Sequence, residues 1–204
     1  MVARERAVAL RRVNHRLTYH RDRARVTLRV VSLERSIRGA LAGGIAAAVW
    51  AAQQPLDKRV FDCDYDDAEL LGKIFTRGPQ WRPIGLALHV QNGAVFGAAY
   101  ALGKPFLPGP PPVRGLLAGL AENFALWPAG RLVDRHHPAR AELTPLAGNR
   151  RALAQATWRH ALFGVLLGTI EHVLNDRSAD EPPPVPVTSN GHGDIESAAM
   201  AVAE

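Results

Sequence analysis

The stretch Gly39-Ala40-Leu41-Ala42-Gly43-Gly44-Ile45-Ala46-Ala47-Ala48-Val49-Trp50-Ala51-Ala52 decides the fold class, because it is apolar on every side. A helix on the surface of a water-soluble protein normally keeps one polar face, and this stretch has none. Three more stretches, 83–103, 115–133 and 153–174, are also mostly apolar. The first two of the four approach the ~20 residues that cross a hydrocarbon core. The pattern predicts an all-α protein, a four-helix transmembrane bundle with helices near 37–55, 82–103, 113–133 and 151–175.

Each apolar stretch carries a Gly-x-x-x-Gly motif. Glycines one helical turn apart remove side-chain bulk from one face, so that two backbones can approach closely. One such pair is weak evidence in an Ala/Gly-rich chain, but four pairs in four stretches predict helix–helix contacts. The glycines are Gly39, Gly43, Gly93, Gly97, Gly115, Gly119, Gly164 and Gly168.

The order of residues around these motifs indicates a duplicated helical hairpin. The segment starting at Arg38-Gly39 resembles the one starting at Arg114-Gly115, and the spacing from His89 to Gly93 and Gly97 recurs from His160 to Gly164 and Gly168. Internal repeats of this parallel kind occur in membrane proteins. We therefore expect the first and third helices to run parallel, and likewise the second and fourth. The four tryptophans then fall toward one membrane face, as an aromatic belt.

Charge divides the chain into three parts: a basic arm at 1–36, a helical membrane domain at 37–175 and a tail at 176–204. Residues 1–38 hold eleven Arg against three acids, and the tail from Asp176 holds six acids against one Arg. The Pro-rich, polar tail is typical of disorder. Cys63 is the single cysteine, which excludes an intrachain disulfide and a cysteine zinc site.

The composition and topology predict the partners and the location. A basic arm next to a membrane helix is expected to contact anionic lipid headgroups. Nucleic acid is a less favoured partner, because the arm has a single aromatic, Tyr19, and no recognisable binding module. The expected partners are the lipid bilayer and, as one option, further copies of the chain. We expect a multi-pass protein of the cell membrane with a cytoplasmic N-terminus.

Two loops have ordinary interpretations. The acidic residues of 62–69 precede apolar residues at helical spacing, so they predict a capped short helix rather than a cation site. His136 and His137, adjacent in a polar loop, are expected to be solvated.

The polar residues of the apolar stretches are the candidate functional residues. Ionisable groups are costly in hydrocarbon and normally face the bundle interior, where they pair with one another. We expect a cluster that binds a ligand or conducts protons, with a raised pKa at Glu122 because desolvation disfavours its charged form. Its candidate members are His89, Asn92, Glu122, Asn123, His160 and Glu171.

Four interpretations of this cluster remain open. It can be structural polar glue, formed by interhelical hydrogen bonds, or a path for protons or small solutes. It can also ligate haem through His89 and His160, or hold a metal through His89, Glu122 and His160, although three ligands lack the paired motif of di-iron bundles. No nucleophile–base arrangement, phosphate loop or nucleotide fingerprint is present, so an enzyme is disfavoured.

Residues 36–175 resemble the small four-helix bacterial inner-membrane proteins of uncharacterised function, in which Gly-rich helices carry a few buried His, Glu and Asn residues. The resemblance implies a membrane location. It assigns no activity, cofactor or site residue.

Overall fold

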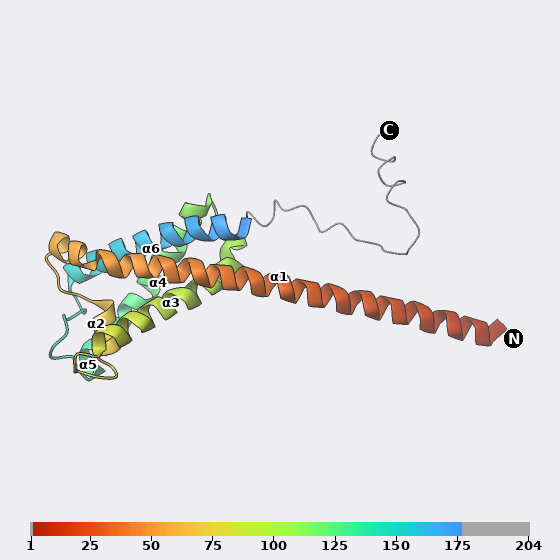
Figure 1. The fold of residues 1–204 in the computed structure, drawn as a ribbon, viewed down its shortest axis with the longest axis horizontal. Helices are drawn as coiled ribbons and strands as arrows, with labels where there is room; N and C mark the ends of the chain where they lie inside the picture. Colours follow the sequence, from red (N-terminus) through yellow and green to blue (C-terminus); the bar gives the residue numbers. More distant parts are fainter. Residues whose placement is uncertain (1, 177–204) are drawn as a thin grey trace, which may run out of the picture.

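The computed structural model describes the backbone of residues 2–176 and the side chains of residues 32–176. Helices account for all its regular elements, and no strand occurs in that part of the chain. The elements are α1 (Val2–Phe61), α2 (Asp67–Gly72), α3 (Trp81–Gly103), η1 (Lys104–Phe106), α4 (Pro111–Leu126), η2 (Trp127–Ala129), α5 (Gly130–His136) and α6 (Arg150–Asp176). The long helices α1, α3, α4 and α6 form the bundle (Figure 1). The prediction of an all-helical bundle is confirmed.

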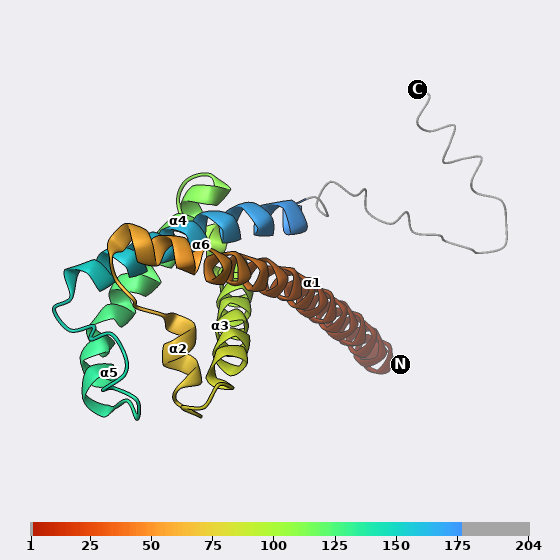
Figure 2. The same cartoon turned by 60° about the vertical axis from the view of Figure 1, so that its left-hand side comes forward.

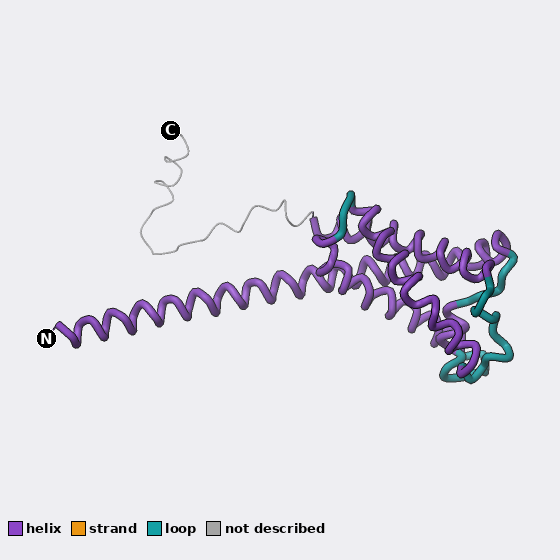
Figure 3. The backbone as a smooth tube through the Cα atoms, turned by 180° about the vertical axis from the view of Figure 1, so that it is seen from behind, coloured by secondary structure: helices purple, strands orange, loops and turns teal. Residues whose placement is uncertain are grey.

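α1 is much longer than the first predicted helix, because the N-terminal arm is part of it. The helix runs from Val2 to Phe61 and projects well beyond the other helices (Figure 3). The predicted boundary at residue 36 is therefore not a break in secondary structure. At its other end, Asp62 adopts a left-handed φ of 47° and the Cys63 N–H donates to the Lys58 carbonyl at 3.2 Å. This arrangement satisfies an otherwise unpaired carbonyl and ends the helix.

The eight glycines of the sequence motifs all lie at helix–helix contacts. Gly39 and Gly43 of α1 face Gly97 and Gly93 of α3, and a Cβ added at any of these glycines would come within 3.0 Å of the opposing backbone. In the second hairpin, Gly115 and Gly119 of α4 meet α6 in the same way, at Gly164, Gly168 and the His160 carbonyl. The predicted glycine contacts are confirmed.

The helix directions also agree with the repeat. The glycine pairs make α1 antiparallel to α3 and α4 antiparallel to α6. Gln155 bonds Asp57 and Asn175 bonds the Arg35 carbonyl, so α6 is antiparallel to α1. α1 and α4 therefore run in the same sense, as do α3 and α6.

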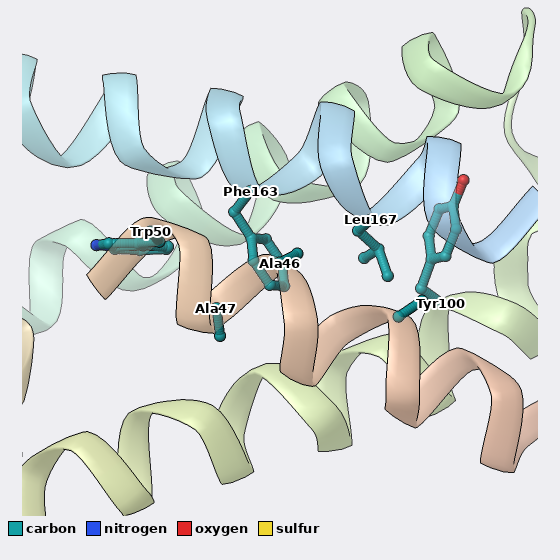
Figure 4. Packing of buried hydrophobic residues seen from close by; sticks show 7 residues of the cluster. Ala46, Ala47, Trp50, Tyr100, Phe163 and Leu167 are labelled. Carbon is teal, nitrogen blue, oxygen red and sulfur yellow. The ribbon is translucent and has the colours of Figure 1, made fainter. Parts of the chain in front are cut away.

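The apolar core is small and lies where α1, α3 and α6 meet. Phe163 and Leu167 point from α6 toward α1, where Ala46 and Ala47 leave room for them (Figure 4). Trp50 belongs to this core and is only 6% exposed. The expected belt of four interfacial tryptophans is therefore wrong for Trp50, because its indole fills the bundle interior.

The third predicted helix is interrupted. α4 ends at Leu126, and the short η2 leads into a separate α5, which turns away from the bundle (Figure 2). The cause is Pro128, which lacks an N–H and whose ring clashes with the preceding turn of an α-helix. The short capped helix is confirmed, since the Asp66 side chain accepts a hydrogen bond from the Glu69 N–H at 3.0 Å.

Within residues 2–176, no helix combines the length and the apolarity needed to cross a membrane. Of the predicted tail at 176–204, residues 177–204 lie outside the described residues.

Two adjacent glycines of α1 provide a test of the packing. Gly43→Ala would drive a methyl group into the Gly93 backbone, whereas a Cβ at Gly44 meets only side-chain atoms at 3.8 Å. We expect Gly43→Ala to destabilise the protein by about 1–3 kcal/mol, because the helices must separate. Gly44→Ala should be neutral or stabilising by up to about 1 kcal/mol, because Ala favours helix. Thermal unfolding of the purified variants measures the difference, and equal effects would contradict the close approach.

Candidate functional site

A cleft with both apolar and polar lining residues opens between α3 and α4. The helices pack in the order α3–α1–α6–α4, so α3 and α4 stand apart while α1 and α6 lie between them. The cleft has a volume of about 170 Å³. Its lining includes four of the six predicted site residues, His89, Asn92, Glu122 and His160, together with Asp67 of α2.

Both histidines of the cleft pack against Trp50. The indole centroid lies 4.8 Å from the His89 ring and 4.7 Å from the His160 ring, in edge-to-face geometry. Burial lowers the pKa of His89 and of His160, so both rings are neutral at pH 7. The Nδ1 of His160 bonds the Ala156 carbonyl at 2.8 Å. The Nε2 of His89 is buried and has no hydrogen-bond partner in the described structure.

Glu122 is the unpaired acid of the cleft. It is half-buried, and within residues 32–176 its carboxyl group makes no hydrogen bond or ion pair. Burial, together with the negative charge of Asp67, raises the pKa of Glu122 to about 7. The predicted rise in the pKa of Glu122 is confirmed. Asn92 is exposed to solvent and lies at the edge of the cleft, which it lines together with His89 and Glu122.

An ion network holds one end of the bundle together. Arg159 of α6 is fully buried and donates to both carboxylate oxygens of Asp57, at 2.7 and 2.6 Å. It also donates to Asp67 at 2.9 Å and to the Tyr65 carbonyl at 3.0 Å. Gln155 donates to Asp57 at 2.6 Å. The Arg159 network therefore joins α6 to α1 and fixes Asp67 at the cleft.

Glu171 lies in a second network and not in the cleft. Its side chain is fully buried and accepts from Lys104 at 2.9 Å and from Asn175 at 2.6 Å. Twelve residues of α6 separate Glu171 from Arg159, a rise of roughly 18 Å. Predicting Glu171 as part of the His89 cluster was wrong, because Lys104 pairs with it at the opposite end of the bundle.

Asn123 is also outside the cleft. It is buried between α4 and α6, where its amide donates to the Thr157 hydroxyl at 3.1 Å. This hydrogen bond joins α4 to α6, which is the kind of contact that the polar-glue interpretation expects.

The cleft does not form an evident cofactor site. Among the described residues, no group of three or more His, Cys, Asp or Glu side chains is arranged to hold a metal ion. His89, Glu122 and His160 share the cleft lining without meeting as a ligand set. A haem held by His89 and His160 would have to displace Trp50, because one indole packs against both rings.

The residues that the sequence prediction missed are the charged partners: Asp57, Asp67, Lys104 and Arg159. The usable signal was Arg159, the single arginine of the apolar stretch 153–174, because a buried arginine requires an acid nearby. His137 was also missed, since it is buried and bonds the Leu70 carbonyl at 3.0 Å instead of being solvated.

No family model, curated protein or solved structure matches this chain. The resemblance to small inner-membrane proteins therefore stays a prediction, and the function must be argued from the site.

Removal of the Arg159 guanidinium tests the buried network. Arg159→Met leaves Asp57 buried without its main partner, and we expect a loss of about 3–5 kcal/mol of unfolding free energy. The control is Arg151→Ala, which breaks an exposed ion pair with Asp62 at 2.6 Å and should cost at most about 1 kcal/mol. Denaturant unfolding measures both, and similar losses would contradict the assigned role.

Proposed function

We propose that this protein is a membrane-bound helical bundle whose cleft between α3 and α4 binds a proton, and with it a small polar solute, at near-neutral pH. The observation that carries the proposal is Glu122, an unpaired carboxyl beside the charge of Asp67 and two neutral imidazoles. The membrane contact rests on the large apolar side chains that the bundle exposes.

Many of the large apolar side chains of the bundle are exposed, and several of its charged side chains are buried. α1 exposes an apolar ridge at every fourth residue, which extends over roughly 24 Å. The ridge comprises Leu33, Ile37, Leu41, Ile45 and Val49, each 41–62% exposed. Contiguous apolar surface of this size is typical of a protein or membrane contact.

Lipid is the favoured contact because the exposed apolar residues are not confined to one patch. α3 exposes Leu86, Val95 and Leu102, and α4 and α6 add further ones: Val113, Leu117, Phe124, Leu126, Trp158, Val165 and Val173. A single protein partner would cover one face, whereas lipid can cover several. The expectation of a multi-pass location in the cell membrane stays a prediction alongside this proposal.

The cleft supports proton uptake for an electrostatic reason. With a pKa of about 7, Glu122 exchanges its proton at physiological pH. The charged and titratable groups that face it are Asp67 of α2, His89 of α3 and His160 of α6, with Arg159 behind Asp67. Protonation of Glu122 removes the repulsion from Asp67. In this proposal, proton uptake by Glu122 and binding of the solute take place in the same cleft.

Polar glue is the second candidate, and Asn123 provides its direct support. A glue residue needs a partner on a neighbouring helix, which Glu122 lacks in the described structure. The two candidates therefore differ at Glu122. A glue role predicts that Glu122→Gln leaves proton-coupled solute flux in reconstituted vesicles unchanged. The proposed role predicts that this flux is lost while the fold is kept, with the exposed Glu34→Gln as the control.

Membrane binding is tested by fractionation and flotation. We expect the protein to remain with membranes after carbonate extraction and to float with vesicles after reconstitution, because exposed apolar surface favours lipid over water. Recovery of a stable monomer in buffer without detergent would overturn this part of the proposal.

The pH dependence of stability tests the environment of Glu122. Its pKa is raised from 4.5 to about 7, so the folded protein favours the protonated form, and stability is lost as the pH rises through this window. Glu122→Gln cannot ionise. We expect the two proteins to be equally stable at about pH 4, below the ordinary pKa of a glutamate, and the variant to be more stable at pH 8, by about 1.5 kcal/mol after allowance for solvent screening. Detergent-phase thermal unfolding at each pH gives the difference, and a constant difference would show an ordinary carboxyl.

A further inference from the structure

The charges in and behind the cleft between α3 and α4 do not balance. Asp67 pairs with Arg159 at 2.9 Å, and the same guanidinium pairs with Asp57 at 2.6 Å. One buried positive charge therefore serves two carboxylates. Glu122 adds a third carboxyl group, which lines the cleft and makes no ion pair within residues 32–176. This part of the bundle therefore has a net negative charge when Glu122 is protonated, and a larger one when Glu122 is ionised.

No positive side chain in the lining of the cleft offsets this charge. Among the described residues the lining contains no lysine or arginine. Its two histidines, His89 of α3 and His160 of α6, are neutral at pH 7, because burial lowers the pKa of both rings. α1 contributes only the uncharged Ala47 and Trp50. An anionic solute would therefore be repelled without a counter-charge, whereas a cationic solute is attracted.

The rest of the lining indicates what kind of cation fits. Leu70 and Leu71 of α2, Phe96 of α3 and Phe163 of α6 give the cleft apolar walls, which favour an apolar body. A hard metal ion needs several oxygen ligands, and no three acidic, His or Cys side chains of the described residues are arranged to hold one. The volume of about 170 Å³ is below the roughly 300–1,000 Å³ of pockets for drug-sized ligands. The fitting cation is therefore small and organic.

We propose that the solute of this cleft is a small primary amine with an apolar body, bound as its ammonium ion against Glu122. The ammonium N–H groups donate to the Glu122 carboxylate, which has no other partner, and such charge-assisted hydrogen bonds are strong. The apolar body lies against Leu70, Leu71 and Phe96. The inference rests on the proposed function for the existence of a solute site, and it adds the charge and the chemical class of the solute.

The proton balance follows from this pairing. A neutral amine that meets protonated Glu122 takes the proton from the carboxyl oxygen onto its nitrogen lone pair, which leaves a carboxylate and an ammonium ion. An amine that arrives as the ammonium ion instead displaces the Glu122 proton to solvent. Both routes give a complex with one proton between the amine and Glu122, which is the proton of the proposed function. Solvent protons and the ammonium ion therefore compete for the same carboxylate.

The test is calorimetric titration of the purified protein in detergent with three probes that share one ring and differ in charge. The probes are benzylamine, benzyl alcohol and benzoate. We expect benzylamine, which stays protonated at both pH values, to bind most tightly at pH 8. At pH 6 its binding should be about tenfold weaker, because Glu122 has a pKa of about 7 and is then mostly protonated. Equal or tighter binding of benzyl alcohol or benzoate at pH 8 would overturn the cationic site.

Glu122→Gln separates the charge from the apolar contact. The variant should bind benzylamine at pH 8 at least about tenfold more weakly and lose the pH dependence, while its affinity for benzyl alcohol is unchanged. The remaining groups that face Glu122, namely Asp67, His89 and His160, are intact in this variant. A pH dependence that persists in Glu122→Gln would therefore assign the competition to one of them and overturn the inference.

Two further variants complete the comparison. Glu34→Gln removes the same charge at an exposed position of α1 outside the cleft, and it should bind all three probes as the wild type does. Phe96→Ala should weaken benzylamine and benzyl alcohol alike, because both share the ring that contacts the wall. Thermal unfolding of each variant in the same detergent shows that the fold is kept. Unchanged benzylamine affinity in both Glu122→Gln and Phe96→Ala would overturn the site.

A separate pair of measurements distinguishes this inference from the proposed function. Infrared difference spectra of wild type and Glu122→Gln follow the protonation of the carboxyl without any solute. A Glu122 that titrates near neutral pH, in a protein with no preference for benzylamine, would keep the proposed proton site and overturn the amine. Binding of benzylamine through Glu122, in a protein that adds no proton-coupled flux over protein-free vesicles, would keep the amine and overturn the proposed path.

Discussion

The close approach of helix backbones at the glycine motifs is the constraint on which the rest of the structure depends. Gly39 and Gly43 bring α1 against α3, and Gly115 and Gly119 bring α4 against α6, with no side chain between them. The two tight pairs join mainly through α1 and α6. α3 and α4 therefore stand apart, and the cleft between them is a consequence of how the glycines pack.

The same constraint bears on why many large apolar side chains are exposed while several charged side chains are buried. Backbones in contact leave little interior volume for large aliphatic side chains, and the apolar core consists of three alanines, three aromatic residues and one leucine. Many of the large residues lie outside, and the interior holds charges that must pair. Arg159 with Asp57, and Lys104 with Glu171, are such pairs at the two ends of α6. A buried ion pair is weak evidence for stability, but removing one partner is costly, so each pair fixes which helices are neighbours.

Between the two ion networks, the cleft contains polar groups that these pairs do not neutralise. Asp67 is shared, since it pairs with Arg159 and also raises the pKa of Glu122. The ion network that holds the fold therefore also sets the electrostatics of the cleft. Trp50 links the apolar core to the cleft, because its indole packs in the core and against both His89 and His160.

The sequence by itself determined the helical class, the four long helices and all eight glycine contacts, because these follow from local periodicity and from the absence of side chains. It also indicated His89, Glu122 and His160, since polar residues in apolar stretches are conspicuous. Only the tertiary structure decided which polar residues pair. Glu171 pairs with Lys104, and Asn123 pairs with Thr157. Asp67, from the short helix α2, lines the cleft. The physical reason is that pairing depends on which helices are neighbours and on their vertical register, and periodicity along one helix specifies neither.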